Sequence, residues 1–117
     1  MNKKILIKKI AEKIIWSMSN FRPTETGLPM VIWVNPKTGL EKHGPRIKVQ
    51  KEHGSKSQLG NWVSVTINKN PEIKGKLSPQ DSKLVVKFIK ENLDNLIALW
   101  DDEISPLEFG SKIKKVK

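Results

Sequence analysis

Three short runs in the middle of the chain restrict its fold more than any other feature. Residues 30–34 (MVIWV) are rich in β-branched and aromatic side chains, and residues 46–51 and 62–68 alternate between apolar and polar or basic side chains. Such runs are typical of strands that bury one face. The loops between them offer no helical stretch of the kind that a parallel crossover needs. The sequence therefore predicts a three-stranded antiparallel meander.

Two segments have helical spacing and are expected to cover this sheet. Residues 3–18 carry an isoleucine-rich apolar stripe, and residues 78–100 carry a longer one that begins with a capping serine and a proline. We predict an α+β fold, a small two-layer domain whose three-stranded antiparallel sheet packs against an N-terminal helix and a long C-terminal helix. This single domain spans residues 1–109, and residues 110–117 (GSKIKKVK) form a basic flexible tail.

Composition excludes several classes of protein. The 117 residues suffice for one domain, and the absence of cysteine excludes a disulfide framework, a thiolate zinc site and a cysteine nucleophile. The longest apolar run, residues 30–34, is far shorter than the roughly 20 residues that a membrane-spanning helix needs. We therefore expect a cytoplasmic protein with no membrane association.

The positive charge is concentrated in the first two thirds of the chain. The formal net charge is +10, with +7 in residues 1–50, +3 in residues 51–76 and zero in residues 77–117. A basic half beside a neutral half favours one surface that attracts phosphates or another polyanion.

The strand at residues 46–51 is the best candidate for that surface. Arg46 and Lys48 alternate with apolar residues, so they share one face, and Trp62 on the next strand would lie beside them if the register allows. Cations for phosphates and an indole for a base are typical of nucleic-acid binding, and we expect RNA rather than DNA. Lys42 and Lys51 would widen the basic field. A solvated basic strand face without a ligand is the alternative, and Trp33 belongs either to this face or to the core.

Residues 75–100 (GKLSPQDSKLVVKFIKENLDNLIALW) resemble the closing segment of a family of small bacterial domains of unknown function. In that family a Gly-Lys-Leu-Ser start leads into a helix that ends in Leu-x-x-x-Trp, here Leu96 to Trp100. The resemblance extends over roughly residues 30 to 104. It implies a toxin-like or regulatory role and a protein partner encoded nearby, because family members are often encoded in pairs similar to toxin–antitoxin modules.

This sequence departs from the family at two strand positions. Where the family usually has histidines, this chain has Arg46 and Lys48, so no metal-binding or acid–base role of those imidazoles carries over. Permanent cations do not ligate metals, but they hold phosphate.

Catalysis is a second hypothesis. The two histidines, His43 and His53, lie in loops at opposite ends of the strand at residues 46–51, which argues against a two-histidine acid–base pair. His43 acting with Arg46 and Lys48 would make a metal-independent ribonuclease. We expect no metal and no cofactor.

Asp101, Asp102 and Glu103 form the only dense acidic cluster and give a third hypothesis. Three acids after a helix oppose its macrodipole, so they need a compensating partner. That partner is either a lysine of the same chain or a basic protein. In the second case the chain would be a protein-binding inhibitor or antitoxin module.

Overall fold

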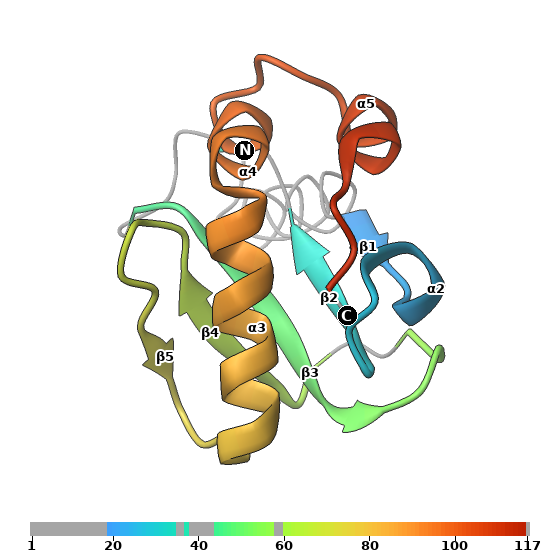
Figure 1. The fold of residues 1–117 in the computed structure, drawn as a ribbon, viewed down its shortest axis with the longest axis vertical. Helices are drawn as coiled ribbons and strands as arrows, with labels where there is room; N and C mark the ends of the chain where they lie inside the picture. The colour runs from blue at the N-terminus through green and yellow to red at the C-terminus, as the bar shows by residue number, and fades with distance from the viewer. Residues whose placement is uncertain (1–18, 35–36, 38–43, 58–59, 117) are drawn as a thin grey trace, which may run out of the picture.

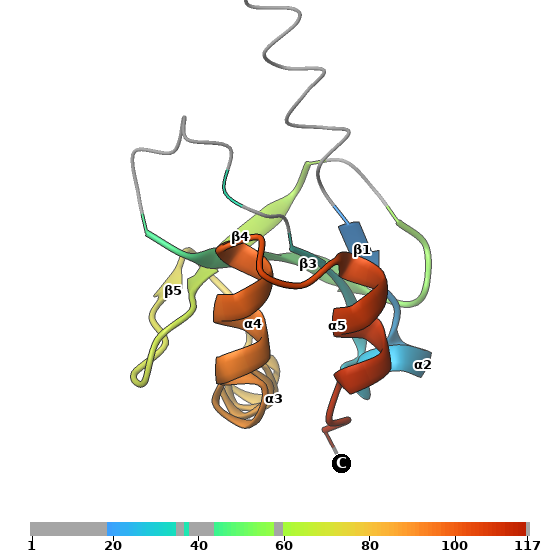
Figure 2. The same cartoon turned by 90° about the horizontal axis from the view of Figure 1, so that it is seen from above.

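A five-stranded antiparallel sheet with helices on one face makes up the structure, a computed structural model that describes residues 19–34, 37, 44–57 and 60–116 (Figures 1 and 2). The strands follow one another in chain order across the sheet, as β1 (Ser19–Phe21), β2 (Met30–Val34), β3 (Arg46–His53), β4 (Trp62–Thr66) and β5 (Ile73–Lys74). The short helix α2 (Pro23–Thr26) connects β1 to β2. The helices α3 (Pro79–Glu91), α4 (Leu93–Trp100) and α5 (Pro106–Lys112) follow the last strand and cover the sheet.

The predicted three-stranded sheet is wrong, because two edge strands extend the meander. β1 has three residues and β5 has two, which is too short for an alternation to appear in the sequence. Pairing with a neighbour defines them instead. Ser19 lies opposite Val34 of β2, and Lys74 lies opposite Ser64 of β4.

The predicted long C-terminal helix is also wrong, because the chain bends at Asn92 and forms α3 and α4 in its place. The Asn92 side chain is buried. Its Nδ2 donates hydrogen bonds to the carbonyl oxygens of Phe88 (2.9 Å) and Lys114 (3.0 Å), and its Oδ1 accepts one from the Lys114 N–H (2.8 Å). An asparagine that bonds to backbone groups in this way competes with regular helix geometry. The N-terminal helix predicted for residues 3–18 lies outside the described residues.

The core lies between the sheet and its helices. Alternate residues of the central strands, Ile47 and Val49 among them, are fully buried and face the apolar side of α3. The helices contribute the following buried side chains: Val85, Phe88, Ile89, Leu96, Leu99 and Phe109. Burying one such side chain stabilises the fold by about 1.5–3 kcal/mol.

Residues 110–116, within the segment predicted as a flexible tail, include the end of α5 and a buried anchor. Val116 is 4% exposed, and its N–H donates to the carbonyl oxygen of Thr26 at the end of α2 (2.9 Å). Figure 1 shows the end of the chain running down from α5 to α2. Gly27, which follows α2, has a φ of +81°, and a Cβ placed there would lie 2.1 Å from the Val116 carbonyl oxygen. Close backbone approach therefore requires glycine at position 27.

We predict that Gly27→Ala destabilises the protein much more than Gly60→Ala. Both glycines have a left-handed backbone, with φ values of +81° and +88°, but a methyl group at Gly60 meets no atom of the described residues within 4 Å. Gly60→Ala should lower the free energy of unfolding by about 1 kcal/mol, because alanine disfavours the left-handed backbone conformation. Gly27→Ala should cost about 3 kcal/mol or more, because Val116 must also move.

Urea denaturation of the two variants beside the wild type measures both losses. Equal losses in the free energy of unfolding would mean that the contact between Gly27 and Val116 does not hold the C-terminal segment.

Candidate functional site

The helices α3, α4 and α5 lie on one side of the sheet (Figure 2), and the strand register assigns seven side chains of the central strands to the opposite face. The register pairs Trp33 with Lys48, Lys48 with Ser64, and Gln50 with Trp62. Directly paired residues of antiparallel strands share a face, and here they alternate with the buried residues that face the helices. We call this surface the Trp–Lys face; its members are Trp33, Arg46, Lys48, Gln50, Trp62, Ser64 and Thr66.

Two indoles form the aromatic centre of the Trp–Lys face. The ring centroids of Trp33 and Trp62 are 5.8 Å apart and their planes are inclined by 43°, within the usual range for interacting aromatic pairs. Both side chains are half-buried. A part of each indole is therefore accessible beside the basic residues.

Gln50 fixes the orientation of Trp33. The Trp33 Nε1–H donates to Gln50 Oε1 (2.7 Å), and Gln50 Nε2 donates to the carbonyl oxygen of Lys56 in the loop after β3 (3.0 Å). Gln50 is only 3% exposed, so its amide relies on protein partners rather than on water. The indole is thus held in place before any ligand arrives.

Lys48 is the cation at the middle of the face. Its Nζ lies 4.5 Å from the centroid of the Trp62 ring, a distance typical of a cation–π contact. Burial lowers the pKa of Lys48 below the ordinary lysine value, and the charge of Arg46 two residues away lowers it further. The folded protein therefore holds two positive charges together at an electrostatic cost, which an anion bound between them would offset.

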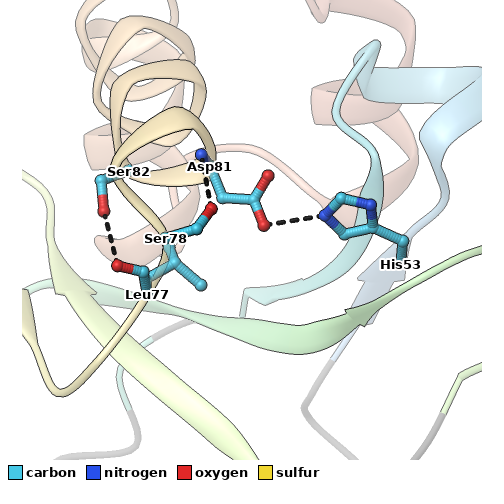
Figure 3. A network of polar contacts seen from close by, with 5 residues as sticks. All are labelled: His53, Leu77, Ser78, Asp81 and Ser82. Atoms are coloured by element: carbon cyan, nitrogen blue, oxygen red, sulfur yellow. Dashed lines mark hydrogen bonds and ion pairs between the residues drawn. The ribbon is translucent and has the colours of Figure 1, made fainter.

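A second polar cluster lies on the helix side of the sheet (Figure 3). His53 at the end of β3 is bonded through Nε2 to Asp81 Oδ2 of α3 (2.8 Å), with side-chain exposures of 59% for His53 and 9% for Asp81. The Asp81 N–H donates to Ser78 Oγ (3.1 Å), which caps α3. This cluster joins the end of β3 to the start of α3, and its strand position differs from the loop predicted for His53.

The predicted nucleic-acid residues fall into three groups. Arg46, Lys48 and Trp62 lie together on the Trp–Lys face, as the strand register requires. Lys51 is exposed at the end of β3, and strict alternation gives it the side of Ile47 and Val49 rather than that of Lys48. Lys42 and the predicted catalytic residue His43 lie outside the described residues.

The acidic cluster follows α4. Lys37 Nζ pairs with Asp101 Oδ1 (3.3 Å), and the Lys37 N–H donates to the carbonyl oxygen of Trp100 (2.8 Å). A lysine of the same chain therefore compensates one acid, although such an exposed pair contributes at most about 1 kcal/mol. Asp102 and Glu103 follow in a turn in which their N–H groups bond to the carbonyl oxygens of Leu99 and Ala98.

The sequence analysis did not count Gln50 among the site residues and left Trp33 open between this face and the core. Both have the strand parity of the Trp–Lys face, which is the signal that could have placed them there. Their hydrogen bond depends on the register between β2 and β3, which the sequence does not reveal.

Comparisons with models of known protein families, with curated proteins and with solved structures found no match to this chain. Among the helices of the described residues, none has the length and apolar character needed to cross a membrane. The described residues also contain no cluster of three or more histidine, aspartate or glutamate side chains that could hold a metal ion.

The lowered pKa of Lys48 makes a prediction about stability. Folding disfavours the charged ammonium of Lys48. The resulting loss in the free energy of unfolding is therefore greatest at pH values below the folded-state pKa. As the pH rises through that value toward the ordinary lysine pKa, the folded state loses its proton first and the Lys48 contribution to the free energy of unfolding increases.

The difference in free energy of unfolding between wild type and Lys48→Met should therefore change with pH. Across the alkaline range, the wild type should become more stable relative to the variant. Chemical denaturation at a series of pH values measures this difference, and subtracting the variant removes the contribution of the other lysines. A pH-independent difference would contradict the account of Lys48.

Proposed function

We propose that this protein binds RNA through the Trp–Lys face and acts in the cytoplasm. The observation that carries the proposal is the position of Arg46 and Lys48 on one strand face, with Lys48 directly opposite Trp33 and over the Trp62 ring. Phosphates and flat bases are the two groups that every nucleotide offers, and cations and aromatic rings are the side chains that bind them.

The charges on this face favour a phosphate ligand over a carboxylate or a neutral molecule. Arg46 presents a planar fork of hydrogen-bond donors that matches phosphate oxygens. Lys48 lies two residues along the same strand and is partly desolvated. A phosphate between the two side chains would offset both their mutual repulsion and the cost of burying Lys48.

Ser64 favours RNA over DNA. It lies directly opposite Lys48 on β4, and its hydroxyl can both donate and accept a hydrogen bond. A ribose 2′-hydroxyl next to a phosphate held by Lys48 could bond to it, and deoxyribose lacks that group.

The resemblance of residues 75–100 to a family often encoded in toxin–antitoxin-like pairs adds a proposed role. In that role the protein would act beside a neighbouring gene product and bind RNA as the toxin-like member. Ribonuclease activity that uses His43 is the enzymatic form of the same proposal, and it predicts shortened RNA in the absence of any divalent metal.

We predict that Arg46→Ala/Lys48→Ala weakens binding to a single-stranded RNA and reduces its salt dependence. For single strands, each phosphate contact contributes about 0.7 to the slope of log affinity against log salt, so two lost contacts should reduce that slope by about 1.4. Fluorescence anisotropy of a labelled RNA across a salt series measures affinity and slope together. A gel of the same samples detects any cleavage.

Lys83→Ala/Lys87→Ala is the matched control. It also removes two positive charges, but from exposed positions of α3, on the other side of the sheet. The control should leave the slope nearly unchanged. Equal losses of RNA affinity in the two double variants would mean that the overall positive charge, and not the Trp–Lys face, attracts the RNA. A wild-type protein that binds no RNA at moderate salt would contradict the proposal.

A further inference from the structure

We infer that the Trp62 indole is a stacking site for one unpaired base and that the Trp–Lys face therefore selects single-stranded RNA over duplex RNA. The inference rests on the proposed function, because it concerns the same face. It adds that the bound RNA is single-stranded and that an unpaired base is the group recognised.

The inclination of the two indoles is the first observation. Two parallel rings stacked face to face would cover each other. The planes of Trp33 and Trp62 are instead inclined by 43° at a centroid distance of 5.8 Å. Both side chains are half-buried rather than enclosed in the core. An inclined pair that is not enclosed in the core can take a third flat ring in exchange for a present neighbour.

The second observation is that the aromatic pair is ordered in advance. The hydrogen bonds from Trp33 to Gln50, and from Gln50 to the Lys56 carbonyl, restrict Trp33, and Trp33 in turn packs against Trp62. A base that stacks on a preorganised indole loses little affinity to ordering the protein.

Lys48 supplies the third observation. Its ammonium lies over the Trp62 ring, in the place that a stacked base would take, and its position is electrostatically unfavourable because of burial and Arg46. A nucleotide offers both groups a better partner. The base stacks on the ring, and the phosphate pairs with the displaced ammonium.

Only an unpaired nucleotide can do this. In a duplex, the faces of each base are covered by its neighbours, whereas an unpaired base can turn out and stack on an aromatic side chain. Phosphate contacts alone do not distinguish the two forms, so discrimination against duplex is the property that separates stacking from simple charge attraction.

The test uses three RNA probes of equal length with the wild-type protein. The probes are a single-stranded RNA, the same strand annealed into a duplex, and a single strand in which every base is replaced by an abasic ribose. The two single strands carry the same number of phosphates. We expect the abasic strand to bind about 5- to 150-fold more weakly than the normal one, the range for one stacked base, and the duplex to bind more weakly as well.

Two variants assign the effect to Trp62. Trp62→Leu should lose affinity for the normal strand and keep its affinity for the abasic strand, because it removes the aromatic ring and leaves the cations. Trp62→Phe, which keeps a smaller ring, should retain most of the preference. The wild-type comparison of probes stands by itself if Trp62→Leu fails to fold.

Equal wild-type affinity for the normal and abasic strands would overturn the inference. If that binding were still salt-dependent and lost in Arg46→Ala/Lys48→Ala, the proposed function would remain and only the stacking site would fail. Absence of binding to all three probes would overturn both.

Discussion

Pairing of β3 with both of its neighbours is the constraint on which the core and the candidate site depend. Its register places Ile47 and Val49 against the helices and, by alternation, Arg46, Lys48 and Gln50 on the opposite face. A slip of one residue would exchange the two sets and bury the cations. The aliphatic core thus determines where the positive charges point, although those charges lie on the opposite face of the sheet.

Polar interactions then shape the face that the core has defined. Gln50 is buried and bonds to both Trp33 and the loop after β3, so a single amide connects two strands and a loop. Lys48 is kept beside Arg46 and over Trp62 despite the cost that its lowered pKa reveals. Like charges held together in this way are found at many anion-binding sites, because a bound anion would offset their repulsion.

Local patterns predicted the central part of the fold and pairing between strands determined the rest. A run of β-branched and aromatic residues located β2, and alternation located β3 and β4 and the faces of Arg46, Lys48 and Trp62. β1 and β5 are too short to carry a pattern, and the bend at Asn92 depends on Lys114, 22 residues away. The bond between Trp33 and Gln50 likewise joins residues 17 apart in sequence. Such contacts follow from the assembled sheet and cannot be deduced from spacing alone.

NMR mapping shows directly whether the Trp–Lys face is the surface that contacts RNA. Titration of ¹⁵N-labelled protein with a single-stranded RNA should shift the backbone amides of residues 46–50 and 62–66 and the indole Nε1–H signals of Trp33 and Trp62. The amides of α3 and the indole of Trp100, which is 8% exposed in α4, should stay unchanged. Shifts concentrated on α3 and α4, with none on the Trp–Lys face, would contradict the account.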